Sequence, residues 1–377
     1  MRTVLQICPF YSEIGGMERA VMDLVAGLKQ DHAVKVLCTK QGPGTEISRR
    51  DGIEVTAVGA RLSVARRPLA LGFPPALAGS SVDIVHYHLP FPLATLSHLL
   101  MPPVYRACLV TWHNDIERPR WFNRIFRPFR DRFLFACDAI LVSSARTVAA
   151  CPLLKQYEQK CRVVTLGVDV RRFESADRHA VQSLRQKLGS PLILFAGRLV
   201  YYKGLDVLLG AMRHLDATLA IVGRGPLEGK LKRLSRQYGI ADRVHFLGYV
   251  PEEELSTAYH ACDVFVLPST MAAEGFGVVQ VEAMICGKPV VNTNLASAVP
   301  EVSVDGQTGL TVPPGDEAAL VGAIDRLLKD PDLRERMGVA GRQRALDMYT
   351  IQRYVAQVKR VYEELADEAV STGKLSR

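Results

Sequence analysis

Two glutamates in one short stretch are the first candidates for chemistry. STMAAEGFGVVQVEAM, residues 269–284, carries Glu274 and Glu282 with seven residues between them. Two carboxylates could act as an acid/base pair, bind a metal ion or accept hydrogen bonds from a neutral polar ligand. Glu274 falls in a glycine-containing loop and Glu282 inside the following helix, so the two do not share one helix face. We therefore expect each to accept hydrogen bonds from a different hydroxyl group of one ligand, and the loop Gly275-Phe276-Gly277 can offer backbone N–H groups beside Glu274.

Two cations follow a predicted strand earlier in the second half. In FAGRLVYYKG (195–204), Arg198 ends the strand and Lys203 begins the next helix. Two positive charges beside a helix N-terminus favour a diphosphate group, because the helix dipole also attracts anions. A pair of surface charges without a ligand is the alternative, but both residues fall on the side of the sheet where ligands bind.

Turns after two other strands could also contact a ligand. Gly15 and Gly16 follow the first strand and open a helix, where a phosphate can approach the backbone. A tight turn without a ligand explains this pair equally well. Tyr249 and Val250 follow a later strand, where a nucleobase could rest against the backbone and an aromatic ring. An ordinary strand-to-helix turn explains them nearly as well.

Histidines end two strands of the first half. His86, His88 and His113 could bind zinc, but no helix with a His–carboxylate motif accompanies them. We interpret His86 and His88 as structural polar residues at a strand end. His113, with Asp115, is the better candidate for contact with a substrate.

A segment rich in arginine and phenylalanine, residues 117–133, has helical periodicity. Its bulky apolar residues recur at helical spacing among arginines: Phe122, Ile125, Phe126, Phe129 and Phe133, with Arg120, Arg124, Arg127 and Arg130. This pattern predicts an interfacial helix that docks on anionic lipid, with a kink or break at Pro128. A core helix with solvated arginines is the alternative. Nucleic-acid binding is not expected, because no recognisable module is present.

Strands and helices alternate along the whole chain, which predicts an α/β fold with parallel sheets. Strands are expected at 3–9, 33–39, 52–58, 82–88, 107–113, 139–143, 161–167, 192–198, 217–223, 243–248, 263–268 and 288–293. Helices are expected at 17–29, 121–136, 203–213, 226–238, 252–261 and 277–286, followed by a helical C-terminal part.

Two such series in succession predict two doubly wound domains, residues 1–173 and 174–349, with residues 350–377 as a C-terminal helix. The boundary is placed near 167–181, where apolar periodicity lapses. Ligands of such proteins bind at the carboxyl ends of the strands and between the domains.

Composition narrows the class of protein. Of 377 residues, 48% are hydrophobic and 23% charged, which excludes a disordered chain. No apolar run of about 18 residues is present, so we expect no membrane span. The start of the chain is interpreted as a first strand and not as a signal peptide. Eight scattered cysteines without a CxxC pair favour free thiols and a cytoplasmic location.

The net charge of +8 is uneven along the chain. Residues up to Phe173 carry 23 Lys and Arg against 14 Asp and Glu, and the remainder carries 24 against 25. The first half is therefore expected to meet an anionic surface or partner, such as the inner face of the cytoplasmic membrane. A solvated basic face without a partner is the alternative.

These motifs together resemble the retaining GT-B glycosyltransferases of family 4. The resemblance covers nearly the whole chain and is carried by GGMER (15–19), GRLVYYKG (197–204), EGFGVVQVEAM (274–284), GKPVV (287–291), VPEVSVDGQTGLTVPPGD (299–316) and LGVDVRRF (166–173). An Asp-x-Asp motif would indicate a metal-dependent GT-A enzyme. The Asp330-Pro-Asp332 sequence is interpreted as a turn between helices.

The resemblance implies roles for the candidate residues. Arg198 and Lys203 would hold the diphosphate of a nucleotide-sugar donor and neutralise the leaving group, so that neither a cofactor nor a metal is required. Glu282 would accept the ribose hydroxyls and Glu274 the sugar hydroxyls, helped by the backbone amides of Phe276, Gly277 and Val278. His113 would lie against the transferred sugar. Gly15 and Gly16 would contact the diphosphate and the acceptor, and helix 350–368 would cross back to the first domain.

Further motifs indicate which donor and which acceptor the protein uses. HYHLPFPLA (86–94), TWHNDI (111–116) and GRLVYYKG are similar to bacterial mannosyl- and deoxyhexosyltransferases of surface-polysaccharide assembly, which favours GDP-mannose or a derived GDP-sugar over a UDP-sugar. A glycan or lipid-linked glycan is the expected acceptor. A nucleotide-sugar epimerase and a non-catalytic sugar-nucleotide-binding protein are the rival classes.

Overall fold

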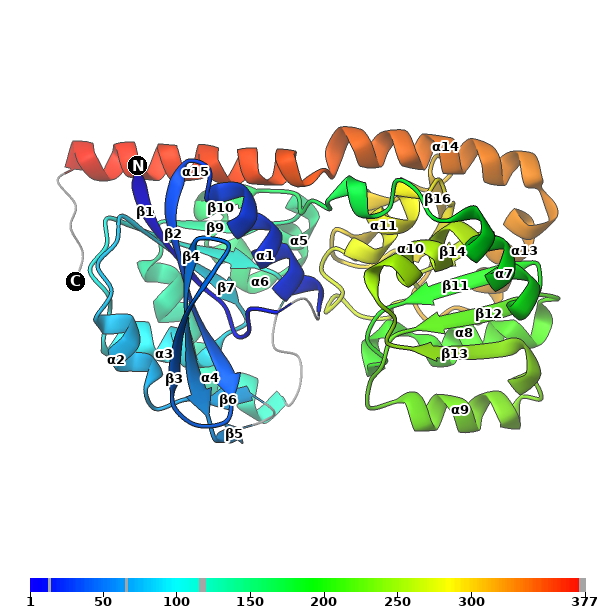
Figure 1. The fold of residues 1–377 in the computed structure, drawn as a ribbon, viewed down its shortest axis with the longest axis horizontal. Helices are drawn as coiled ribbons and strands as arrows, with labels where there is room; N and C mark the ends of the chain where they lie inside the picture. The colour runs from blue at the N-terminus through cyan, green and yellow to red at the C-terminus, as the bar shows by residue number, and fades with distance from the viewer. Residues whose placement is uncertain (13–14, 65–66, 115–119, 373–377) are drawn as a thin grey trace. The chain divides into compact units, whose positions relative to one another are not determined.

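Two compact units make up the computed structural model, which describes residues 1–12, 15–64, 67–114 and 120–372. One unit comprises Met1–Leu166 together with Ile351–Arg377, and the other comprises Gly167–Thr350. Each contains a parallel sheet covered by helices, so the chain has the expected α/β class with two doubly wound sheets (Figure 1).

The first unit is built on an eight-stranded sheet with the order β10-β9-β8-β7-β1-β2-β4-β3. Its strands are β1 (Arg2–Ile7), β2 (His32–Gln41), β3 (Thr45–Arg50), β4 (Ile53–Ala60), β7 (Ile84–Leu89), β8 (Ala107–Trp112), β9 (Ala139–Val142) and β10 (Cys161–Val163), and a small hairpin adds β5 (Leu62–Val64) and β6 (Arg67–Leu69). Its helices are α1 (Gly16–Leu28), α2 (Phe73–Ala78), α3 (Pro92–Leu100), α4 (Arg120–Ala136), α5 (Ala145–Ala150), α6 (Pro152–Gln156) and α15 (Ile351–Thr372).

The second unit has a six-stranded, fully parallel sheet with the order β13-β12-β11-β14-β15-β16. Its strands are β11 (Leu192–Ala196), β12 (Thr218–Val222), β13 (Val244–Gly248), β14 (Val264–Val266), β15 (Val290–Thr293) and β16 (Gly309–Val312). Its α-helices are α7 (Arg178–Leu188), α8 (Leu205–Ala211), α9 (Glu228–Gln237), α10 (Glu252–Ala261), α11 (Val278–Ile285), α12 (Val299–Val302), α13 (Glu317–Lys329) and α14 (Pro331–Met348).

Central strands of both sheets are buried along their whole length. Every residue of β7, β8, β9 and β11 is buried. Such continuous apolar runs are typical of parallel strands that are covered by helices on both faces. All four strands were expected from the apolar runs of the sequence.

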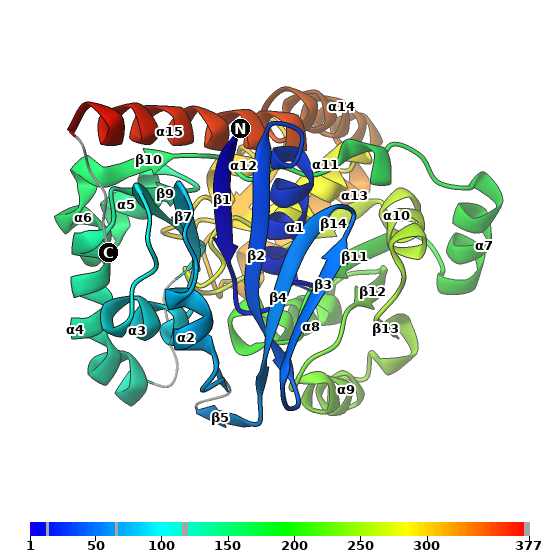
Figure 2. The same ribbon diagram turned by 60° about the vertical axis from the view of Figure 1, so that its left-hand side comes forward.

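Four strands were missed, β3, β16 and the short hairpin strands β5 and β6, because none of them forms a long apolar run. TEISRR forms β3, an exposed edge strand that pairs antiparallel with β4. Figure 2 shows β2, β4 and β3 side by side. The charged side chains of β3 suit an edge strand, because they discourage pairing with another chain. The short β16, GLTV, closes the other sheet beside β15.

The division between the units falls earlier than the expected boundary at residue 173. Residues 167–173 belong to the second unit because they are bonded to it. The N–H of Val168 donates to the carbonyl of Tyr349 at 2.8 Å, and the ring of Phe173 packs edge-on against Tyr259 with centroids 5.7 Å apart.

The C-terminal helix α15 packs on α1 within the first unit (Figure 1). The two helices approach closely at Gly27, where an added Cβ would lie 2.4 Å from a methyl group of Val355. Within the described part of the chain, no helix is both long and apolar enough to cross a bilayer.

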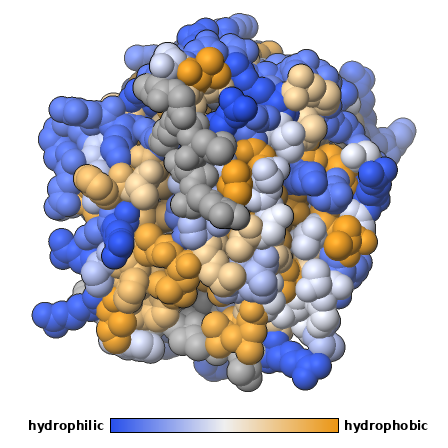
Figure 3. All heavy atoms as spheres, turned by 90° about the vertical axis from the view of Figure 1, so that its left-hand side faces the viewer, coloured by the Kyte–Doolittle hydropathy of each residue, from blue (hydrophilic) through white to orange (hydrophobic). Residues whose placement is uncertain are grey.

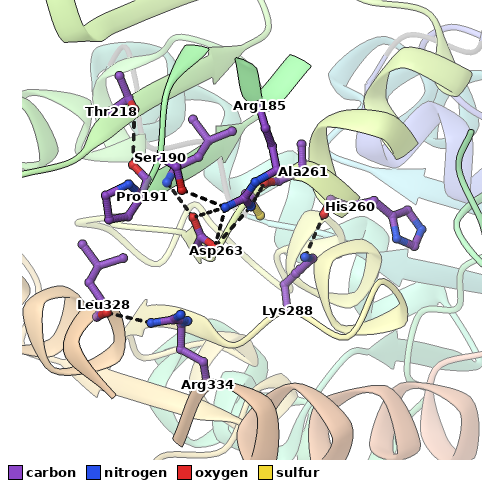
Figure 4. A network of polar contacts seen from close by, with 12 residues as sticks. Arg185, Ser190, Pro191, Thr218, His260, Ala261, Asp263, Lys288, Leu328 and Arg334 are labelled. Carbon is purple, nitrogen blue, oxygen red and sulfur yellow. Dashed lines mark hydrogen bonds and ion pairs between the residues drawn. The ribbon is translucent and has the colours of Figure 1, made fainter. Parts of the chain in front are cut away.

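A charged network holds the amino-terminal edge of the second sheet (Figure 4). Arg185 of α7 donates to the carboxylate of Asp263 and to the carbonyl of Ala261, and Asp263 also accepts the N–H of Leu192 at 2.7 Å. These hydrogen bonds give partners to polar groups between α7 and the second sheet. This edge is a structural one, and the chemistry is sought at the opposite edge.

Candidate active site

The carboxyl ends of β11 and β14 form the switch point of the second sheet. The chain runs from β11 to β12 and β13 on one side, then returns to β14 on the other. At such a point the loops after the two central strands diverge and leave room for a ligand. Lys203 lies in the loop after β11 and Glu274 in the loop after β14, so the topology brings these two predicted residues together.

Lys203 and Glu274 form a direct ion pair at this point. The Nζ atom of Lys203 lies 2.5 Å from Oε2 of Glu274, and both side chains are about nine-tenths buried. The hydroxyl of Ser269 donates to the same oxygen at 3.1 Å. A buried pair of this kind keeps a strong donor and a strong acceptor together in a site with little water. Lys203 and Glu274, for which separate roles were expected, are therefore bonded to each other as one ion pair.

Glycines allow the loops to come this close. Lys203 does not begin α8, as the sequence suggested, but ends a single 3₁₀ turn (Tyr201–Lys203) before Gly204. Gly204 has a left-handed backbone, with φ of 65°, and an added Cβ would lie 1.9 Å from the carbonyl oxygen of Pro268. Any other residue at position 204 would push the β14 loop away from Lys203.

Arg198 lies in the same loop as Lys203, but in a different environment. It is exposed, whereas Lys203 is buried. Among the described residues, no ion pair involves Arg198. The predicted pair of cations thus consists of one solvated arginine and one lysine that is already balanced by a carboxylate.

Glu282 lies inside α11, as expected, and is held by a tyrosine that the sequence did not indicate. The hydroxyl of Tyr259 in α10 donates to Oε2 of Glu282 at 2.7 Å. Burial and the nearby Glu282 charge raise the pKa of Tyr259 well above its ordinary value, so the hydroxyl keeps its proton. No spacing in the sequence relates Tyr259 to Glu282, because the contact is between two helices.

The loop between Glu274 and α11 is fixed by buried amides. Gln280 donates to the carbonyl of Phe276 at 2.8 Å, and Asn292 of β15 donates to Gln280 at 3.1 Å. Gly277 caps α11 in a left-handed conformation, and Val278 starts the helix, whose first N–H groups have no partner within it. Gln280 and Asn292 were missed, because isolated amides in apolar runs carry no motif.

Tyr249 and Val250 follow β13 directly, as predicted. Tyr249 is 55% exposed, so its ring is accessible to a ligand. Val250 is half-buried. The chain turns at Gly248, whose φ is 70°.

In the first unit, Gly15 caps α1 and Gly16 begins it. An added Cβ on Gly15 would lie 2.3 Å from Oε2 of Glu18, so a carboxylate lies beside the place where we expected a phosphate. Within the part of the chain that the structure describes, no side chain lies within 4 Å of the Cβ position of Gly16. The turn interpretation therefore fits Gly15, while Gly16 remains accessible to a ligand.

A buried polar network links the histidines of the first unit. His86 bonds the hydroxyls of Tyr362 and Thr111, at 2.7 Å each. His88 bonds Gln6 at 2.8 Å and His113 at 3.2 Å. Each ring nitrogen of His86 and His88 has a partner, which fits the structural interpretation of these two residues.

His113 follows the last residue of β8 and is the half-buried end of this network. Burial lowers its pKa to about 4 and that of His86 to about 3, so both rings are neutral at pH 7. The expected neighbour Asp115 lies outside the described residues.

Asp330 caps α14 and accepts the N–H of Leu333 at 2.8 Å. Its Asp-x-Asp sequence is therefore a helix start between α13 and α14, as expected. All eight cysteines have free thiols.

Known proteins share this architecture. A sucrose-phosphate synthase from Thermosynechococcus elongatus aligns with 97% of this chain and 99% of its own, with a TM-score of 0.82 and 22% identity. A D-rhamnosyltransferase of Pseudomonas aeruginosa, WbpZ, is 31% identical over 89% of both chains. The O-antigen chain mannosyltransferase C of Escherichia coli is 31% identical over 76% of both.

Family models match each unit separately. Residues 14–172 match the model described as Glycosyltransferase Family 4, and residues 177–344 match the model described as Glycosyl transferases group 1. The first match covers His86, His88 and His113, and the second covers Lys203, Glu274 and Glu282. With its two Rossmann-like sheets and relatives along nearly its full length, this chain belongs to the GT-B glycosyltransferases of family 4.

Proposed function

We propose that this glycosyltransferase moves a hexose from a nucleotide-sugar to a glycan or lipid-linked glycan, with retention of configuration and without a metal. The observation that supports the proposal most directly is the buried Lys203–Glu274 pair at the switch point of the second sheet. It offers a cation to a diphosphate and a carboxylate to sugar hydroxyls within one small site.

Different residues of the second unit contact different parts of the donor. Lys203 has three N–H donors, so it can keep its bond to Glu274 while donating to a phosphate oxygen. Arg198 is exposed at the same strand end and adds a second positive charge for the leaving diphosphate. Glu282, already oriented by Tyr259, accepts the ribose hydroxyls, and the ring of Tyr249 lies beside the nucleobase.

The first unit supplies contacts to the sugar and the acceptor. Gly16 leaves space at the start of α1, and His113 is neutral and half-buried at the end of β8. A neutral imidazole suits a neutral sugar hydroxyl better than it suits a phosphate.

GDP-mannose or a GDP-deoxyhexose is the proposed donor, for surface-polysaccharide assembly at the cytoplasmic side of the membrane. Two relatives that are each 31% identical, over 89% and 76% of this chain, are a D-rhamnosyltransferase and an O-antigen mannosyltransferase. A UDP-sugar is the second candidate.

A donor screen followed by a transfer assay tests this function. GDP-, UDP-, dTDP- and ADP-sugars are compared by thermal shift, and the preferred donor should stabilise the chain by mass action. Transfer from that donor should proceed in the presence of a chelator. Activity that is lost in chelator and restored by magnesium would refute the metal-independent mechanism. Epimerised donor in the absence of an acceptor would favour an epimerase instead.

We further propose that α4 docks on an anionic bilayer. Trp121, Ile125 and Phe129, spaced four residues apart, are 57%, 64% and 45% exposed and form one apolar stripe. Arg124, Arg127 and Arg132 are exposed on the same helix. Apolar side chains flanked by arginines match a lipid surface with negative headgroups.

The structure corrects the composition of this predicted surface. Phe126 and Phe133 are buried in the first unit, so they do not belong to the exposed stripe. Arg130 is also buried, with its guanidinium 5.9 Å from the ring of Trp112 and bonded to Asn123. The helix continues through Pro128 without a break. Figure 3 shows apolar side chains gathered beside strongly hydrophilic ones on one face of the molecule.

Vesicle sedimentation tests the docking surface. The chain should bind phosphatidylglycerol vesicles, bind phosphatidylcholine vesicles much less, and dissociate as salt rises. Ile125→Asp should weaken binding about tenfold or more, since a charge would enter the apolar stripe. Val339→Asp is the matched control, because Val339 is 65% exposed in α14 of the second unit. Equal binding to both lipids, or equal loss in both variants, would refute the proposal.

A further inference from the structure

The polar network of the first unit reaches from the C-terminal helix to His113. Gln6 of β1 donates through Nε2 to the hydroxyl of Tyr362 in α15 at 2.8 Å, and its Oε1 lies 2.8 Å from Nε2 of His88. Nδ1 of His88 then lies 3.2 Å from Nε2 of His113, with the two rings stacked. Four elements thus meet in one hydrogen-bonded chain.

This chain lies where apolar side chains would be expected. Gln6, His86 and His88 of the sheet and Tyr362 of α15 are fully buried. The other face of the same sheet carries an extensive apolar core. Burying polar groups is unfavourable unless each finds a partner, and apolar residues of similar size would stabilise such a layer at least as well. Among the described residues, the network ends at His113, its half-buried member, and stability alone does not explain why it ends there.

The direction of the hydrogen bonds fixes where the protons are. The Oε1 atom of Gln6 can only accept, so Nε2 of His88 carries a proton. Burial lowers the pKa of His88 well below its ordinary value, so the ring is neutral and its Nδ1 can only accept. His113 must therefore donate from Nε2. Because His113 is neutral too, its Nδ1 is left as a hydrogen-bond acceptor.

We propose that Gln6, His88 and Tyr362 are positioning residues that hold His113 in its neutral Nε2–H tautomer, so that Nδ1 accepts a hydrogen bond from a hydroxyl of the transferred sugar. The inference rests on the proposed function for the identity of the sugar. The tautomer itself does not depend on that function. Tyr362 makes α15 part of the arrangement, since it anchors the amide of Gln6.

The tautomer is tested directly by ¹⁵N NMR of histidine-labelled protein, with the His113 signal assigned by its loss in His113→Ala. The nitrogen shifts should show the proton on Nε2 at pH 7.5. A proton on Nδ1, or an equal mixture of tautomers, would overturn the proposal whether or not the protein transfers a sugar.

Two amide substitutions at position 88 separate positioning from structure. An asparagine amide reaches about as far as Nδ1 of histidine, so His88→Asn keeps a partner for His113. A glutamine amide reaches about as far as Nε2, so His88→Gln keeps the bond to Gln6 and leaves His113 without one. We expect His88→Gln to lower kcat on the order of tenfold or more, with the donor KM nearly unchanged. His88→Asn loses the bond to Gln6 but keeps an acceptor for His113, so it should lower kcat less than His88→Gln does.

His98→Asn is the control for loss of a buried histidine in the same unit. His98 is buried and bonds the hydroxyl of Tyr87 at 2.8 Å, outside the network. It should lower stability and leave kcat unchanged. Equal kcat values for His88→Gln and His88→Asn would overturn the positioning role.

A double substitution identifies which proposal has failed. If His88 acts through His113, His88→Gln should have no further effect on kcat in the His113→Ala background. A His113→Ala enzyme with full activity would refute the sugar contact, and therefore the proposed role of His113, while the NMR result still decides the tautomer. A further loss of kcat in the double variant would show that His88 acts independently and would overturn the inference.

Discussion

Both units bring polar side chains together at a topological switch point, but these side chains are charged in the second unit and neutral in the first. In the second unit, the loops after β11 and β14 bring together charged side chains, Lys203 and Glu274. In the first unit, the switch between β1 and β7 brings together neutral ones, Gln6 and His88. A buried ion pair suits a ligand that carries charge, and a neutral hydrogen-bonded chain suits one that carries only hydroxyls. Under the proposed function, the charged pair would suit the diphosphate of a nucleotide-sugar and the neutral chain would suit its sugar hydroxyls.

The largest effect is expected from breaking the ion pair. Glu274→Ala should lower kcat about 10³-fold, because the sugar loses its acceptor and Lys203 loses its orientation. It should also lower the free energy of unfolding by about 3–5 kcal/mol, because a buried lysine is left without a partner. Steady-state kinetics and urea denaturation measure the two effects.

The double variant Lys203→Met/Glu274→Gln sharpens this test. Removing both charges should restore much of the stability while the enzyme stays inactive. An undiminished Glu274→Ala enzyme would contradict the assignment of the site to this pair.

As the pH falls, the first unit should lose stability before the second. In the first unit, burial lowers the pKa of His86 to about 3, and of His98 and His113 to about 4. An unfolded chain takes up these protons below about pH 6.5, while the folded one does not until pH falls to those lower values. The free energy of unfolding should therefore fall with pH between about 6.5 and 4, by at most about 1.4 kcal/mol per pH unit for each histidine.

Hydrogen exchange distinguishes the units. Between pH 7.5 and 5, protection relative to the intrinsic exchange rate should decrease in β7 before it decreases in β14. In the second unit, His260 also has a lowered pKa, but it is only half-buried. Simultaneous loss of protection in both strands would show that the neutral network does not set the acid sensitivity.

The smallest effect is expected at the ribose end of the site. Glu282→Gln should raise the donor KM on the order of tenfold and leave kcat nearly unchanged, since only one charged acceptor for ground-state hydroxyls is lost. Tyr259→Phe removes the bond that orients Glu282 and should show the same pattern more weakly. A change in kcat of the same size as for Glu274→Ala would place Glu282 at the reacting sugar instead.

Local signals in the sequence predicted much of the fold. Apolar strands such as ACLVTWH and LILFAGR were recognisable because strands covered on both faces are apolar throughout. The exposed β3 was not recognisable, because its stability comes from pairing with β4 and not from its own residues. For α4, the periodicity predicted the helix correctly, but the exposed face could not be known before Phe126 and Arg130 were placed.

For the site, the sequence determined residue types and their order along the chain. Glycines beside Arg198, Lys203 and Glu274 mark sharp turns at strand ends, and these signals are local. Only the tertiary structure decided the partners: Lys203 with Glu274, Glu282 with Tyr259, and His113 with His88. Each of these pairs joins separate elements or loops that the fold brings together, and no local pattern encodes such a contact.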